Sequence, residues 1–207
     1  MFTCAQCAIE ACRSGQLDKL PKNCPMHDPD FFEQVLTEYF KPENHDFFVA
    51  SAATEAIGYG RWPRLREVME FARRMGYRKL GIATCAGLLP EARTLARILR
   101  AHGFEVCSVA CKAGMTDKSV LGVPEACRSI GVNMCNPILQ AIHLNRAGTE
   151  LNVAVGLCVG HDSMFCKYSH APVTTLVVKD RVTGHNPVAA IYCADGYFHD
   201  RLTSPQE

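Results

Sequence analysis

The stretch LNVAVGLCVGHD, residues 151–162, joins a β-strand pattern to a group of reactive side chains. It begins with a mostly apolar, valine-containing run, which is typical of a strand buried on both faces of a parallel sheet. The run ends at Cys158 and is followed by Gly160, His161 and Asp162. Because ligands bind beyond the carboxyl ends of the strands in α/β sheets, these groups occupy the position expected of a site.

Three further strand patterns occur outside this stretch, and apolar residues at helical spacing lie between them. The alternation of strands and helices predicts a Rossmann-like parallel sheet of four or five strands, flanked by helices and built from right-handed crossovers. We expect the strand order 2-1-3-4, with the switch point between the first and third strands. The further strands are KLGIATC (79–85), FEVCSVAC (104–111) and VTTLVVKD (173–180), with PVAAIYC (187–193) as a candidate fifth, and the helices cover 88–102, 137–147 and 162–168, with a short one at 124–130.

The residues before this sheet divide into two segments. Residues 1–27 form a polar, cysteine-bearing module with little periodicity, and residues 28–76 read as a helical segment packed on the core. Helices are expected over 28–40, 46–57 and 63–75. The predicted organisation is therefore a metal- or cluster-binding module at 1–27, helices at 28–76 and the α/β domain at 77–207.

Composition excludes several functional classes. The net charge is +1, from 22 basic and 21 acidic residues, with no basic stripe that indicates nucleic-acid binding. Residues 1–4 begin no signal peptide, and no apolar run is long enough to span a membrane. Motifs for dinucleotide binding and for the common hydrolases are absent. We therefore expect a cytoplasmic protein without nucleic-acid or membrane partners, whose twelve cysteines stay reduced and serve metal or thiol chemistry.

Four cysteines lie at the ends of predicted elements. Cys85, Cys111 and Cys158 end three strands, and Cys135 precedes the Asn136-Pro137 helix start. In the predicted topology all four reach one edge of the sheet, so we expect a shared metal or cluster site. Thiolates prefer soft metals, and ligands from four separate loops favour an iron–sulfur cluster of the [4Fe–4S] type over structural zinc. The alternative is that they are small buried hydrophobes, which we assign to Cys107, Cys127, Cys166 and Cys193.

A second group, Cys4, Cys7, Cys12 and Cys24, lies in the N-terminal module with Pro25 after the last cysteine. A C-x₂-C pair with two more thiols indicates a metal site. The Cys-Pro ending favours [4Fe–4S] over zinc, which usually uses two C-x₂-C pairs. Disulfides are the remaining alternative, and the cytoplasm argues against them.

Several charged residues adjoin the predicted sheet edge. Lys112 and Lys118 are expected to balance the negative charge of a cluster, to hold an anionic substrate or to be ordinary solvated lysines. His161 and Asp162 are candidates for a ligand, a proton donor or a neighbour of the ligands, with helix capping as the alternative for Asp162. For the residues after the fourth strand, a role in the site and a solvated turn explain the pattern equally well; these are Lys179, Asp180, Arg181, His185 and Asn186.

The motifs together resemble the domain-of-unknown-function 1847 family. They are CAQCAIEAC…NCP, GIATCAGLLPEA, VACKAG, MCNPILQA, GLCVGHDSMF and APVTTLVVKDRVTGHNP, and they extend over essentially the whole chain. Members are small proteins described as metal-binding, mostly from anaerobic bacteria and archaea. The resemblance implies metal binding at the cysteines in these motifs and a low-oxygen cytoplasm.

Three functions are compatible with these patterns. The first is an iron–sulfur protein with one or two clusters that performs redox or Lewis-acid chemistry with a small molecule or redox partner. In it, three sheet-edge cysteines would ligate the cluster and the fourth, such as Cys135, would be a nucleophile or displaceable ligand. The second is a zinc-binding structural or metal-delivery protein without catalytic activity. The third is a thiol enzyme that uses Cys135 or Cys158 with His161. In the first reading we expect Cys158 to be a ligand, with His161 beside it.

Overall fold

The computed structural model describes residues 4–204. The chain divides into two compact units, Met1–Ile57 and Gly58–Glu207, each of which is described by itself. The boundary falls inside the helical segment predicted at 28–76, and the three-part division of the chain stays a prediction. Residues 1–3 and 205–207, which that division includes, lie outside the described residues.

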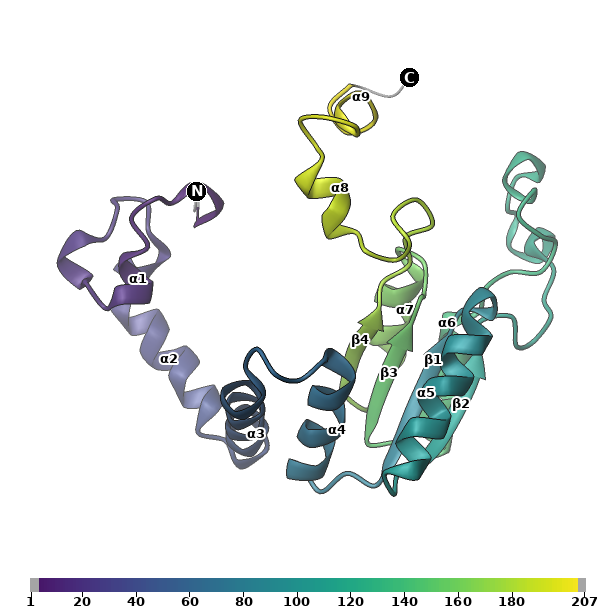
Figure 1. Ribbon diagram of the computed structural model, residues 1–207, viewed down its shortest axis with the longest axis horizontal. Helices are drawn as coiled ribbons and strands as arrows, with labels where there is room; N and C mark the ends of the chain where they lie inside the picture. The colour runs from purple at the N-terminus through teal and green to yellow at the C-terminus, as the bar shows by residue number, and fades with distance from the viewer. Residues whose placement is uncertain (1–3, 205–207) are drawn as a thin grey trace. The chain divides into compact units, whose positions relative to one another are not determined.

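The second unit is built on a parallel four-stranded sheet in the order β2-β1-β3-β4 (Figure 1). Both the α/β class with a parallel sheet and the strand order are confirmed. The central strands β1 and β3 are almost entirely buried, which explains their continuous apolar sequences. The strands are β1 (Lys79–Thr84), β2 (Glu105–Ala110), β3 (Leu151–Val155) and β4 (Val173–Val177).

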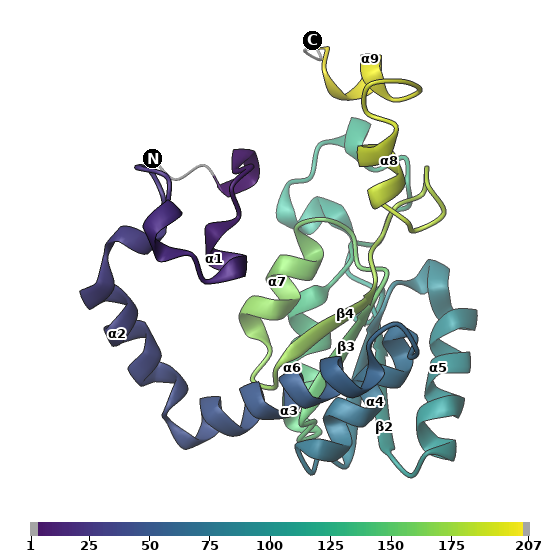
Figure 2. The same ribbon diagram turned by 60° about the vertical axis from the view of Figure 1, so that its left-hand side comes forward.

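Helices cover both faces of this sheet (Figure 2). Alternate residues of a strand point to opposite faces, so Leu80 and Ile82 pack with α4 and α5 while Ala83 packs with α6 and α7. Leu144 of α6 and Phe165 of α7 complete the second apolar layer. The helices are α4 (Arg64–Arg74), α5 (Leu89–Ala101), α6 (Pro137–Arg146) and α7 (His161–Tyr168).

Polar side chains secure the two ends of the sheet. At the amino end, the Glu150 carboxylate accepts hydrogen bonds from the backbone N–H groups of Arg78 (2.7 Å) and Lys79 (2.8 Å). At the carboxyl end, the buried Gln140 amide donates to the carbonyl oxygens of Thr84 (3.1 Å) and Val109 (2.7 Å). Gln140 therefore ties the end of β1 to the end of β2, where two cysteines follow.

The fifth strand expected at 187–193 is wrong, because Val188–Tyr192 forms the helix α8. Pro187 already has helical dihedral angles, φ −62° and ψ −23°, and Ala189 N–H bonds to Asn186 O. A short apolar run fits a strand or a helix equally well from its pattern. Here the Asn-Pro start and the two alanines favour the helix. Asn136-Pro137 starts α6 in the way expected, with the Asn136 side chain accepting from Leu139 N–H at 3.0 Å.

Two long segments follow strands at the carboxyl end of the sheet (Figure 1). Residues 111–136 follow β2, and an isolated bridge between Asp117 and Asn133 closes the segment on itself. Residues 178–204 follow β4. The helix expected at 124–130 is reduced to a single 3-10 turn. The elements here are η5 (Lys118–Leu121), η6 (Glu125–Cys127), α8 and α9 (His199–Leu202).

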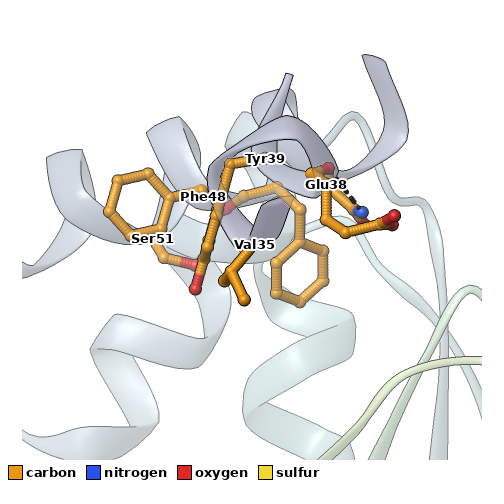
Figure 3. A pocket seen from close by; sticks show the side chains of 7 residues that line it. Val35, Glu38, Tyr39, Phe48 and Ser51 are labelled. Carbon is orange, nitrogen blue, oxygen red and sulfur yellow. Dashed lines mark hydrogen bonds between the residues drawn. The ribbon is translucent and has the colours of Figure 1, made fainter. Parts of the chain in front are cut away.

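The first unit joins short turns to two longer helices. The Asp28 side chain caps α2 by accepting from Phe31 N–H at 3.0 Å. An apolar hollow of about 470 Å³ lies between α2 and α3, where Tyr39 and Phe48 meet edge to face (Figure 3). No cysteine lines it, so the candidate chemistry lies elsewhere. The elements are η1 (Cys4–Gln6), α1 (Ala11–Ser14), η2 (Leu17–Lys19), η3 (Pro25–His27), α2 (Pro29–Tyr39) and α3 (Pro42–Gly58).

Within residues 4–204, no helix has both the length and the apolar character needed to cross a membrane.

Candidate functional site

Cys85 and Cys111 occupy equivalent positions at the carboxyl edge of the sheet. Each extends the hydrogen-bond ladder by one residue: Cys85 N–H bonds to Val155 O at 3.0 Å, and Cys111 N–H bonds to Thr84 O at 2.8 Å. Cys111 is 3% exposed, and Cys85 is partly buried against the same apolar cluster. The ladder thus places two thiols on adjacent strands, as the sequence predicts.

Cys135 reaches the same place from the far end of the 111–136 segment. Asn136 N–H bonds to Cys111 O at 2.7 Å, which anchors the returning chain beside β2. Cys135 packs against the same apolar cluster as Cys111. Burial raises the pKa of Cys111 to about 12, the Ala86 N–H opposes this shift, and the nearby Cys135 and Cys85 add to it. Cys111 is therefore a neutral thiol at pH 7 rather than a free nucleophile.

Backbone N–H groups point at two of these sulfurs. Ala86 N–H donates to Cys111 Sγ at 3.3 Å, and Gly87 N–H donates to Cys85 Sγ at 3.4 Å. Both N–H groups belong to η4 (Ala86–Leu88), the turn that leads from β1 into α5. The first turn of this crossover therefore supplies hydrogen bonds that favour negative charge on the thiols.

The backbone after β3 passes close to the same turn at Gly156. Gly156 has φ +66°, and a Cβ added there would lie 2.0 Å from Leu88 Cδ1 and 3.9 Å from Cys85 Cβ. Only glycine combines this left-handed conformation with such close packing. The chain that continues to Cys158 therefore leaves β3 directly against the Cys85 turn.

The Arg181 side chain bonds to Cys158 and interacts electrostatically with two of the other thiols. The guanidinium donates from Nη2 to Cys158 Sγ at 3.3 Å. This hydrogen bond raises the pKa of Arg181, and the charges of Cys158, Cys85 and Cys135 add to the shift. Arg181 thus lies within electrostatic range of three of the four sheet-edge cysteines, the name we use for Cys85, Cys111, Cys135 and Cys158.

Arg181 belongs to a hydrogen-bonded turn within residues 179–185, and its side chain is exposed. Asp180 Oδ1 accepts from Val182 N–H (2.9 Å) and Thr183 N–H (3.0 Å). His185 closes the loop: its N–H bonds to Asp180 O at 2.7 Å and its Nδ1 accepts from Asp180 N–H at 3.1 Å. A role in the site and a solvated turn explain the sequence here equally well, although the Asp-x-x-Thr-Gly pattern is typical of such a hydrogen-bonded turn.

His161 and Asp162 begin α7, three and four residues after Cys158. Burial lowers the pKa of His161, the positive charge of Lys112 lowers it further, and Asp162 opposes both. Asp162 does not cap the helix, because Gly160 is the capping residue and the Asp162 carboxylate accepts from Ser163 N–H at 2.7 Å. The Lys112 ammonium donates to Asn133 O. Lys118 lies in η5, where its ammonium donates to Cys127 O at 3.4 Å.

The N-terminal cysteines, which are Cys4, Cys7, Cys12 and Cys24, are arranged differently. Cys4, Cys7 and Cys24 line one hollow of about 300 Å³, together with Pro21 and Asn23. Cys12 lies in α1 and is not among its lining residues. Three of the four predicted ligands are thus brought to one place.

All twelve cysteines are free thiols in the described chain. Among residues 4–204, no three His, Cys, Asp or Glu side chains stand in an arrangement suited to a single metal ion. Both predicted ligand sets therefore stay predictions. Cys107 is partly buried, as expected for a small hydrophobe, whereas that reading is wrong for the exposed Cys127, Cys166 and Cys193.

These features define an α/β protein with a parallel sheet whose carboxyl edge carries four thiols. The chain belongs to the family described as "Protein of unknown function (DUF1847)", whose sequence profile matches residues 24–176. It is 46% identical over 189 residues to the uncharacterized protein MJ0455 of Methanocaldococcus jannaschii, across 91% of this chain and 93% of that relative. The predicted family membership is confirmed. The matched range contains all four sheet-edge cysteines and Cys24, and it ends before Arg181.

Proposed function

We propose that this protein holds an iron–sulfur cluster, of the [4Fe–4S] type, on the four sheet-edge cysteines. The observation that carries the proposal is their convergence: the loops after β1, β2 and β3 bring four thiols to one sheet edge, and hydrogen-bond donors point at three of the sulfurs. Thiolates that carry a cluster are stabilised by N–H···S hydrogen bonds, which also tune the reduction potential.

The donor set fits a cluster better than a single ion. Four thiols are the ligands that [4Fe–4S] clusters use, and each thiolate binds a different iron. The sulfurs then need not meet at one point, which is consistent with the lack of a single-ion arrangement among residues 4–204. Structural zinc sites, in contrast, usually take their ligands from close C-x₂₋₄-C pairs.

When bound, such a cluster supplies electron transfer or a Lewis-acidic iron. The residues around it have separate tasks in this proposal. Arg181 and the η4 N–H groups stabilise negative charge on the sulfurs by donating hydrogen bonds to them. Burial and the charge of Lys112 lower the pKa of His161 and favour its neutral form, and Asp162 lies beside it. Cys135, on the loop return, is the candidate for a displaceable ligand or nucleophile.

A second candidate function is a zinc-binding structural or metal-delivery protein, and the N-terminal module favours it. Ala11 is the one buried residue among residues 4–27. Small modules without a core commonly depend on metal to fold. A site on Cys4, Cys7 and Cys24, with Cys12 as the fourth ligand, would hold zinc or a second cluster.

The proposed location is the cytoplasm, since exposed free thiols persist in a reducing compartment. The proposed partner is a small molecule or a redox protein.

Anaerobic purification with iron, sulfide and zinc analysis and a visible spectrum tests the proposal. The wild-type protein should be brown, with iron and sulfide in similar amounts. Replacing Cys85, Cys111 or Cys158 with Ser should remove the sheet-edge iron and leave the N-terminal metal. Cys107→Ser is the matched control, because Cys107 packs in the same apolar cluster but is not a proposed ligand. Colourless wild-type protein with stoichiometric zinc would contradict the cluster.

A further inference from the structure

Two cations border the sheet-edge thiols without a carboxylate partner. The Arg181 guanidinium donates to Cys158 Sγ at 3.3 Å. The Lys179 ammonium lies 3.7 Å from the point that a Cβ on Gly87 would occupy, and Cys85 Sγ lies 3.8 Å from the same point. Lys179 therefore flanks Gly87 beside the Cys85 sulfur. Within residues 4–204, neither cation forms an ion pair with Asp or Glu.

Two acidic residues that adjoin this edge in sequence accept hydrogen bonds from the backbone. Asp180, between the two cations in sequence, accepts from two N–H groups of its own loop. Asp162 accepts from Ser163 N–H at 2.7 Å. Lys112, whose charge acts on His161, adds a third positive group near this edge. The edge thus carries cations that form no ion pair with a carboxylate in the described part of the chain.

The loop that presents the cations is held in one conformation. His185 has φ +68°, a left-handed conformation that is uncommon for a residue with a side chain. Its two hydrogen bonds to Asp180 maintain this conformation. Such local strain is concentrated at ligand sites, where it holds binding groups in place before the ligand arrives.

We propose that Arg181 and Lys179 bind the oxyanion group of a small substrate, a carboxylate or a phosphate, next to Cys85 and Cys158. Arg181 is exposed, and its planar fork has further N–H donors besides the one given to Cys158. It therefore matches a carboxylate or phosphate edge, while Lys179 supplies a point charge. The inference rests on the proposed cluster for the chemistry done on this substrate, but not for its binding.

The test measures anion binding on full-length protein in two states, metal-free with reduced thiols and metal-loaded, by calorimetric titration at low ionic strength. Inorganic phosphate and acetate are titrated in separate experiments. The anion that binds more tightly indicates whether the substrate carries a phosphate or a carboxylate. Arg181→Gln and Lys179→Gln should each weaken binding about tenfold, the effect of losing one charge-assisted hydrogen bond. Arg181→Lys should weaken it less. Arg93→Gln, on the exposed side of α5, is the matched charge control.

The outcomes separate this inference from the proposed function. If wild-type protein binds neither anion in either state, or if the Arg181→Gln/Lys179→Gln double variant binds as tightly as wild type, the anion site is wrong. If the cations serve only the cluster, Arg181→Gln will shift the cluster potential while wild-type protein binds no anion, which also overturns the inference. Phosphate or acetate binding by a protein that never takes up iron would support the anion site and contradict the cluster.

Discussion

The two cysteine groups of this protein differ in what holds their thiols in place. Cys85 and Cys158 follow the buried strands β1 and β3, where Ile82 and Val153 are at 0% exposure, and Cys111 is itself 3% exposed. The N-terminal cysteines lie on short turns, where Cys4 and Cys12 are exposed. The apolar core therefore positions the first group before any ligand binds, whereas Ala11 is the one buried residue around the second group within residues 4–27.

The largest expected difference is the response to metal removal. A chelator should abolish the order of the N-terminal module and leave the sheet folded, because binding a structural zinc ion contributes about 10–16 kcal/mol of apparent free energy in small modules. Hydrogen exchange measured by mass spectrometry checks this. Residues 4–27 should lose protection, and the peptides of β1 and β3 should keep it. Equal loss in both regions would show that the sheet also depends on metal.

Ile82→Ala should destabilise the second unit, which contains the sheet, and leave the N-terminal module unaffected. Ile82 is fully buried in the apolar layer between the sheet and the helices α4 and α5. The substitution removes methyl groups and leaves a cavity, which should lower the free energy of unfolding of the second unit by about 3 kcal/mol. Urea unfolding followed by circular dichroism measures the loss. Metal bound to the N-terminal cysteines should be unchanged, and its loss would contradict the independence of the two regions.

Gly156→Ala tests how β3 approaches the cysteine turn. The added methyl group must displace Leu88, and alanine must adopt φ +66°, so we expect a loss of about 2 kcal/mol. Sheet-edge iron should fall and N-terminal metal should not. Gly148→Ala is the matched control, because Gly148 has φ +65° with nothing within 4 Å of the added atom. If both variants lower the iron content equally, the close approach is unimportant.

The smallest effect concerns Glu150, at the end of the sheet opposite the thiols. Hydrogen bonds from Lys79 and Arg78 N–H lower the pKa of this carboxyl below its ordinary 4.5. Its stabilisation is therefore fully present above about pH 4.5 and is lost as the pH falls through the lowered pKa. Glu150→Gln should lower the free energy of unfolding by about 1 kcal/mol at pH 7, since the group is partly exposed.

Urea unfolding curves at pH 7 and pH 3 measure this difference between wild type and Glu150→Gln, which should shrink at the lower pH. Glu33→Gln, on α2 in the other unit, is the control. Metal content should be unchanged in both variants. A difference that grows on acidification would contradict the sign of the pKa shift.

Much of the fold was predictable because its signals are local. Runs such as KLGIATC and LNVAVGLC are too apolar to be anything but buried, and Asn136-Pro137 marks a helix start in both sequence and structure. The pattern of Val188–Tyr192 predicts a strand as readily as the helix that it forms, because five apolar residues have no distinct period. Whether such a run pairs with β4 as a strand or forms a helix depends on the Pro187 turn and on contacts with residues outside a short stretch of sequence.

The site divides in the same way. Hydrophobic patterning is enough to predict the parallel sheet and the placement of Cys85, Cys111 and Cys158 after its strands, since strand ends and crossovers follow from that pattern. The three-dimensional fold was needed to show that Asn136 returns to bond Cys111 O, that Gly156 brings β3 against the Cys85 turn, and that the 179–185 loop places Arg181 on Cys158. The physical reason is that these contacts join residues more than twenty positions apart, and their geometry depends on loop conformations set by hydrogen bonds rather than by hydrophobic periodicity.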